Sequence, residues 1–281
     1  MHTRHQILLR LASALAIGVF VLPGCGNKNI EADTPAQAEA ADGQEPLTEA
    51  QATVLIASDP EADPDLRRQA LITIATSTVA DLPVYLDFYR ATLADVSIDP
   101  TVAAVAAAAL GNHGEPADSG RLTPLLTRDE PFLRWQAAVA LQRLHNPQAI
   151  SPLITAATGD DDTDVRIAAA TALGQYPGPE AYRGLTLALD DRAYGVSRAA
   201  REALKLMTQH DAGDDPRAWR QYALDNADRL FNQPGPFTYT PYPPDRGLLL
   251  SILLFWDRPE ADPVFPTGYE PPDDNTADVG G

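Results

Sequence analysis

The chain has 281 residues with a formal net charge of −18, and 44% of them are hydrophobic. A chain of this length forms one or two domains, and its hydrophobic content is sufficient to bury a core. The excess of Asp and Glu over Lys and Arg argues against a nucleic-acid-binding protein, which presents a basic face. The single cysteine excludes an intramolecular disulfide and any zinc or iron–sulfur site built from cysteines.

Residues 1–24 have the pattern of an export signal. Arg4 and Arg10 make the start basic, and an uncharged, largely apolar run follows at 11–22. This run is too short for a membrane-spanning helix, which needs about 20 apolar residues. It has the length of the apolar region of a secretory signal peptide.

The signal ends in Leu22-Pro23-Gly24-Cys25, which resembles the lipobox of bacterial lipoproteins. In that family the cysteine thiol takes a diacylglyceryl group and a peptidase cuts just before it. The resemblance therefore implies cleavage between Gly24 and Cys25 and a lipid on Cys25, although Pro23 replaces the more usual Ala, Ser or Thr. The alternative is an ordinary secreted protein whose cysteine has no such role.

The resemblance also implies a location in the bacterial cell envelope, anchored to a membrane by lipid. Gly26 stands where an aspartate is the usual inner-membrane retention signal of enteric-type bacteria. In a Gram-negative cell this favours the periplasmic face of the outer membrane. Residues 25–51 then form the lipidated cysteine and an acidic tether with too few large apolar residues to fold, so we expect disorder there.

Residues 52–231 contain an internal repeat. Apolar anchor residues recur at intervals of 36, 31, 32 and 31 residues, namely Leu66, Val102, Leu133, Val165 and Val196. Eight residues after each anchor lies a leucine or isoleucine, and the stretch between is rich in alanine at helical spacing. Each unit therefore begins with an alanine-rich helix.

Acidic residues mark where these helices start. They lie three residues before the first four anchors, at Asp63, Asp99, Glu130 and Asp162, and proline follows the first three. A carboxylate caps the free N–H groups of a helix, and proline suits the first helical position. The same Asp-Pro pair occurs at Asp215-Pro216, near the end of the repeat region.

A second element follows each of the first four of these helices. Its equivalent positions, Pro83, Pro124, Pro152 and Gly184, fall 17, 22, 19 and 19 residues after their anchors. Each unit is therefore a helical hairpin, the building block of a repeat array. The predicted fold is all-α, an α-solenoid of about five hairpins without a β-sheet.

The pattern resembles HEAT repeats, specifically the short HEAT-like kind also seen in phycobilisome lyases. The clearest matches are the cap Asp162, the pairs Val165-Arg166 and Ala168-Ala169, and the closing Leu173-Gly174. The resemblance implies a solenoid whose second helices line a concave face. It also implies a ladder of Arg and Asp contacts between neighbouring repeats.

The sequence offers little support for catalysis or for a metal site. The acidic run 160–164 is one calcium candidate, but it lacks the glycine and distal glutamate of a calcium loop, so capping explains it better. His113, His145 and His210 have no metal-binding spacing, and the chain contains no G-x-S-x-G motif or phosphate loop. We therefore expect no enzyme, no cofactor and no metal.

The candidate partner-binding residues are on the second helices. Arg121, Tyr182 and Arg183 precede core leucines, and Arg and Tyr are frequent at interface hot spots. The alternative is that all three are ordinary solvated residues. Trp219 has a different expected role, which is to close the end of the core.

Residues 232–281 form a proline-rich tail with an uncharged apolar strip at 247–256. The strip is too short to span a bilayer. It either folds back to cap the solenoid or docks on a partner or membrane surface. The acidic residues 257–281 are expected to be disordered.

These features together predict a membrane-anchored scaffold or adaptor in the cell envelope that binds a protein on its concave face and binds no nucleic acid. The lyase resemblance supports a second hypothesis, that the protein is an accessory subunit of an enzyme. The third hypothesis is a structural protein of the envelope. Because fold alone does not fix function, the choice among them depends on the surface that the repeats build.

Overall fold

The computed structural model describes residues 48–241 and 262–272. Gly24, Cys25, most of the acidic tether and the apolar strip 247–256 lie outside the described residues. The chain divides into two compact units, residues 1–88 and 89–281, and each is described here by itself. No described helix combines the length and the apolar character needed to cross a bilayer.

In the first unit, helices α2 (Glu49–Ser58) and α3 (Pro64–Ala75) pack against each other. Thr48 and Gln51 form a reciprocal capping box at the start of α2, a helix that the repeat pattern does not predict. Asp63 caps α3 as expected. The anchor Leu66, however, is 59% exposed, unlike the later anchors, and the core face of α3 begins at Ala70.

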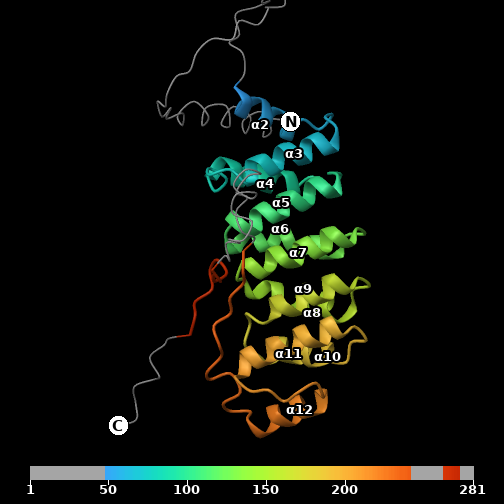
Figure 1. Cartoon of the computed structure of the whole chain (residues 1–281), viewed down its shortest axis with the longest axis vertical. Helices are drawn as coiled ribbons and strands as arrows, with labels where there is room; N and C mark the ends of the chain where they lie inside the picture. Colours follow the sequence, from blue (N-terminus) through green and yellow to red (C-terminus); the bar gives the residue numbers. More distant parts are fainter. Residues whose placement is uncertain (1–47, 242–261, 273–281) are drawn as a thin grey trace, which may run out of the picture. The chain divides into compact units, whose positions relative to one another are not determined.

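The second unit is a two-layer stack of helices, in the order that Figure 1 shows. The first helices of successive repeats pack on one another in one layer, and the second elements pack in the other. The first helices are α5 (Pro100–His113), α7 (Pro131–Arg143), α9 (Thr163–Leu173) and α11 (Tyr194–Thr208). The second elements are α6 (Ser119–Leu122), α8 (Ile150–Gly159), α10 (Pro179–Ala188) and α12 (Pro216–Asp225), while α4 (Pro83–Leu93) crosses the boundary between units.

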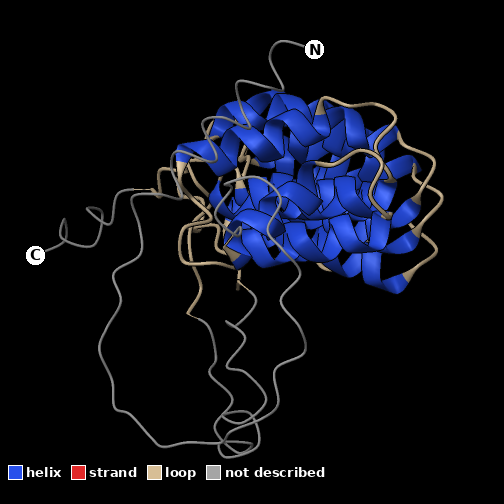
Figure 2. Cartoon of the chain, turned by 90° about the horizontal axis from the view of Figure 1, so that it is seen from above, coloured by secondary structure: helices blue, strands red, loops and turns tan. Residues whose placement is uncertain are grey.

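The all-α repeat fold is thus confirmed for the part of the chain that the structure describes, where Figure 2 shows helices joined by loops. The anchors Val102, Leu133, Val165 and Val196 are at most 1% exposed. Small residues bring the first helices close together: a Cβ on Gly111 of α5 would lie 2.8 Å from a backbone atom of α7. The alanine-rich pattern therefore sets the close spacing of this layer.

Most of the predicted caps are made. The carboxylates of Asp99, Asp162 and Asp215 accept hydrogen bonds from backbone N–H groups in the first turns of α5, α9 and α12. Such a cap stabilises a helix by about 1 kcal/mol. Glu130 occupies the same position before α7, but its side chain makes no cap hydrogen bond. Its longer side chain lies instead 3.8 Å from the guanidinium of Arg128.

The second element of the repeat that begins with α5 is broken. It consists of the 3₁₀ turn Pro116–Asp118, the four-residue helix α6, and the 3₁₀ helix Thr123–Thr127, labelled η2. Proline lacks a backbone N–H and clashes with the preceding turn, which stops an α-helix. Pro152 lies in the first turn of α8, where proline is tolerated, whereas Pro124 falls after a full helix turn and ends α6.

Part of the predicted disordered tail is ordered. Residues 262–272, here called the strap, lie against the ends of the first helices. Thr267 donates its backbone N–H to the carbonyl oxygen of Arg143 and accepts from the N–H of His145, both at 2.8 Å. Tyr239 and Val264 exchange two backbone hydrogen bonds of 3.0 and 2.9 Å. The expectation of disorder is therefore wrong for these residues.

Aromatic and glycine contacts complete the attachment of the strap. Phe237 is buried against Gly174, the residue that follows α9, and its N–H donates to the hydroxyl of Tyr269 in the strap at 3.0 Å. Gly268 has a φ of +82°, and a Cβ on it would lie 2.5 Å from Cγ of Pro116. The composition of the tail does not predict these contacts, because they depend on backbone and side-chain groups that lie near the ends of the first helices.

We predict that Gly268→Ala destabilises the protein more than Gly213→Ala. Both glycines have a positive φ, so each alanine costs about 1 kcal/mol of left-handed backbone strain. Only Gly268 is packed, because no atom lies within 4 Å of a Cβ at Gly213. Chemical unfolding of the two purified variants measures the difference, and equal free energies would show that the strap does not pack on Pro116.

Candidate protein-binding surface

Arg134 on α7 and Arg166 on α9 make the same contacts one repeat apart. Arg134 donates to both carboxylate oxygens of Asp160 at 2.8 Å, and Arg166 donates to those of Asp191 at 2.7 and 3.2 Å. Each arginine also donates from Nη1 to two backbone carbonyl oxygens in the loop before its own helix. We call these two sets of contacts the Arg–Asp ladder.

The ladder carboxylates are held in the ionised form. The side chains of Asp160 and Asp191 are only 6% and 13% exposed, and burial by itself raises the pKa of each. The hydrogen bonds and charge of the partner arginine, with a backbone N–H two residues further on, outweigh burial and hold the pKa below its ordinary value. The ladder is therefore a pair of charged, hydrogen-bonded contacts that join each repeat to the next loop.

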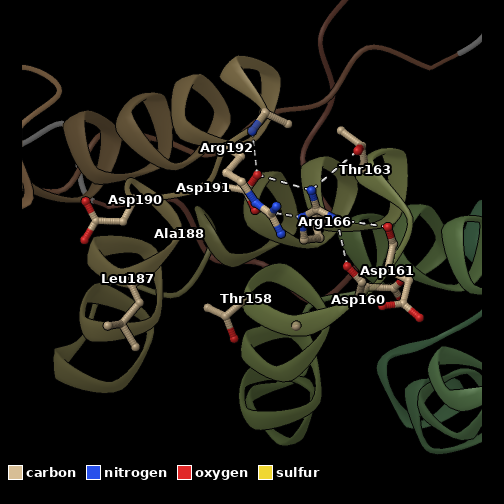
Figure 3. Close-up of a pocket in the computed structure, with 12 residues that line it drawn as sticks. Thr158, Asp160, Asp161, Thr163, Arg166, Leu187, Ala188, Asp190, Asp191 and Arg192 are labelled. Atoms are coloured by element: carbon tan, nitrogen blue, oxygen red, sulfur yellow. Dashed lines mark hydrogen bonds and ion pairs between the residues drawn. The ribbon is translucent and has the colours of Figure 1, made fainter.

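Two hollows lie beside the ladder, on the side of the second elements. The first, of about 860 Å³, opens between η2 and α8, where the broken second element leaves space. The second, of about 680 Å³, lies between α8 and α10 (Figure 3). Gly159, Asp160 and Asp161 line both hollows, and we call the two adjoining hollows together the inter-repeat groove.

The groove was not among the sites that the sequence predicted. One feature of the sequence is related to the groove, namely the spacing of Pro124. Pro124 follows its anchor by 22 residues, whereas Pro152 and Gly184 follow their anchors by 19. That shift moves proline from the first turn of the helix to its middle, and the resulting break opens the first hollow. The spacing was visible in the sequence, but its consequence depends on what packs beside it.

Two of the three predicted partner-binding residues are exposed on the second elements. Arg121 on α6 has a 48% exposed side chain, and its guanidinium lies 3.5 Å from the buried carboxylate of Asp118. Asp118 is also bound by Arg90, at 2.7 and 2.9 Å. Arg183 on α10 is exposed as well. Neither arginine lines the inter-repeat groove.

Tyr182, the third predicted residue, is a core residue and not a surface residue. It is 4% exposed, and its hydroxyl donates to the backbone carbonyl of Trp219 at 2.7 Å. Burial raises the pKa of Tyr182 to about 12, so the hydroxyl stays protonated and remains a donor. Trp219 is itself fully buried, with Nε1 donating to the carbonyl of Gly213. The helical register of α10 turns Tyr182 toward α12, because neighbouring residues on a helix point about 100° apart.

The acidic run 160–164 has structural roles. Asp160 binds Arg134, and Asp162 caps α9 through bonds of 2.9 and 3.1 Å to two backbone N–H groups. Among the described residues no group of three His, Cys, Asp or Glu side chains is arranged to hold a metal ion. His145 contacts Gln175 and lies between two tyrosine rings, and burial lowers its pKa.

One comparison with known protein families agrees with the repeat pattern of the sequence. Residues 121–205 match the family model of HEAT repeats. No curated protein matches the chain. Among solved structures, the chain is similar to a designed armadillo repeat protein in complex with the peptide (KR)4, with 18% identity, a TM-score of 0.45, and coverage of 65% of this chain and 93% of that chain. The matched HEAT segment contains both ladder arginines and the whole of α8, α9 and α10.

We predict that Tyr182→Phe lowers the free energy of unfolding by about 1 kcal/mol, since it removes one buried hydrogen bond. Arg183→Ala, one residue further on, changes an exposed side chain and is expected to leave stability within about 0.5 kcal/mol. Urea unfolding of the two variants measures both effects. A neutral Tyr182→Phe would contradict the core role that burial assigns to this residue.

We also predict that the ladder makes the fold sensitive to acid. The folded pKa of Asp160 and Asp191 lies below the ordinary value of about 3.9, so their contribution is complete above that value and is lost as pH falls below it and through the folded pKa. Asp160→Asn with Asp191→Asn should cost about 3 kcal/mol near neutral pH, because it leaves two partly buried arginines without a counter-charge. Its stability should then fall less steeply in acid than that of the parent protein.

Unfolding free energies between about pH 7 and pH 3 test this prediction. Asp161→Asn is the matched control, because the carboxylate of this exposed neighbour accepts no hydrogen bond within the described residues, and Arg166 binds only its backbone carbonyl. Parallel stability curves for the double variant and the parent would refute the ladder's role in acid sensitivity.

Proposed function

We propose that this protein is a lipid-anchored scaffold of the cell envelope that binds a partner protein on the face of its second helices. A HEAT-like repeat fold is typical of protein–protein interaction scaffolds and is typically not catalytic. The observation that carries the proposal is the inter-repeat groove, which runs across two repeat junctions on that face. The ladder behind it keeps the groove walls in fixed register.

The anchor belongs to the proposal through the lipobox-like sequence at Gly24 and Cys25. Each buried CH₂ of a lipid chain contributes about 0.8 kcal/mol of membrane binding, so several chains hold a protein at the bilayer. A scaffold held there meets membrane-bound partners at a raised effective concentration. The anchor thus increases partner binding without adding any contact to the groove.

Site-specific photo-crosslinking in intact cells tests the proposal. A benzophenone amino acid at Arg183, exposed on α10, is expected to capture one partner protein. The same group at Glu202, exposed on α11 of the first-helix layer, serves as the control. Equal capture from both positions, or none from Arg183, would contradict a partner on the second-helix face.

The contribution of the anchor is measured in the same experiment. With Cys25→Ser in the Arg183 crosslinking variant, capture of the partner is expected to fall, since the protein no longer collects at the membrane. Unchanged capture and unchanged membrane fractionation would refute the lipid anchor. That result would leave a partner on the second-helix face as a separate conclusion.

A further inference from the structure

The first hollow of the inter-repeat groove has an apolar floor. Leu126 and Ala156 lie at its base and are each 6% exposed, and Pro124 and Pro152 form part of its walls. It lies beside η2, the last part of the broken second element.

Four threonines of the groove present only hydrogen-bond acceptors to a ligand, whereas Thr163 accepts a bond from Arg166 and donates none among the described residues. Thr127, Thr155 and Thr158 each donate the hydroxyl proton to a backbone carbonyl of their own helix, at 3.0, 3.2 and 2.8 Å. Thr123, also in the groove, does the same at 2.8 Å. A hydroxyl that has donated its proton has only lone pairs left to offer. The groove therefore favours a donor-rich ligand.

The charges of the groove favour a cation. The two ladder arginines lie in it, but Asp160 and Asp191 neutralise them. Three further carboxylates in the lining, those of Asp129, Asp161 and Asp190, are exposed and accept no side-chain hydrogen bond among the described residues.

Cationic groups in the lining offset only part of this charge. The guanidinium of Arg128 is 3.8 Å from the carboxylate of Glu130, which offsets its charge. Apart from the two ladder arginines, the exposed Arg192 is the remaining positive group in the lining. The net charge of −18 for the whole chain acts in the same direction over longer range.

We propose that the inter-repeat groove binds a basic segment of a partner protein, with Lys or Arg side chains flanking small apolar residues. The apolar residues pack on Leu126 and Ala156, and the cationic groups donate to the carboxylates of Asp129, Asp161 and Asp190. Backbone N–H groups of the segment donate to the threonine hydroxyls. This inference rests on the proposed function and adds the chemistry of the partner.

Fluorescence anisotropy with the full chain in detergent tests the inference. The probe is the labelled peptide Lys-Leu-Lys-Ala-Lys-Leu-Lys, and its counterpart with Glu in place of Lys is the negative probe. We expect the basic peptide to bind and the acidic peptide not to bind. Removing the three groove carboxylates, by Asp129→Asn with Asp161→Asn and Asp190→Asn, should weaken binding by about tenfold.

Two further variants separate the groove from the overall charge. Asp81→Asn with Asp225→Asn and Asp228→Asn removes the same charge at exposed sites outside the groove, and it should change the dissociation constant by less than about twofold. Thr155→Trp places a bulky ring in the groove at an exposed position and should abolish binding without unfolding the protein.

Equal weakening by the two triple variants would overturn the inference, because it would show binding to the general negative field. Binding that persists in Thr155→Trp would overturn it as well. If the basic peptide does not bind while crosslinking from Arg183 still captures a partner, the chemistry assigned to the groove is wrong and the scaffold function stands. If both experiments fail, the scaffold function fails too.

Discussion

The contact on which the repeat stack depends is the one between an arginine and the loop that follows its own hairpin. Close packing, as between Gly111 of α5 and Ala140 of α7, holds neighbouring first helices together. A bidentate arginine–carboxylate pair has a fixed geometry, and it is strongest where water is excluded. Arg134 and Arg166 therefore fix the register of α8 and α10 relative to the layer of first helices.

The same contact explains why the groove is acidic although two arginines line it. Because the ladder arginines are partly buried and paired with carboxylates, they contribute structure and little net field. The carboxylates one residue away, at Asp161 and Asp190, remain exposed on the rim. An irregular second element then opens the floor beside them. In each of these two loops, one aspartate pairs with a ladder arginine and the aspartate next to it supplies negative charge at the surface.

Much of the repeat fold could be predicted from the sequence, because helical periodicity and helix caps are local signals. Asp99, Asp162 and Asp215 cap the helices that they were expected to cap. Glu130 does not, because one additional methylene carries its carboxylate away from the backbone N–H groups. Leu66 satisfies the spacing but is exposed, so the pattern is least informative in the first repeat.

Less of the candidate site could be predicted from the sequence. Arg121 and Arg183 are exposed as expected, but Tyr182 lies in the core, because a difference of one residue on a helix separates the surface from the interior. The groove depends on how η2, α8 and α10 pack, which no single segment encodes. The ordered strap likewise depends on Pro116, His145 and Gly174, all of them distant from it in the sequence.

The strap also changes how the second unit behaves as a physical system. A repeat array is normally one-dimensional, since each repeat contacts only its neighbours and its ends fray independently. The strap and Phe237 contact groups that follow three successive first helices, α5, α7 and α9. None of these three repeats can open without releasing a segment that the other two also hold. They therefore form a cooperative block, and the segment that carries Phe237 extends it to α11, because Gly235 donates its N–H to the carbonyl oxygen of Leu206 at 2.7 Å.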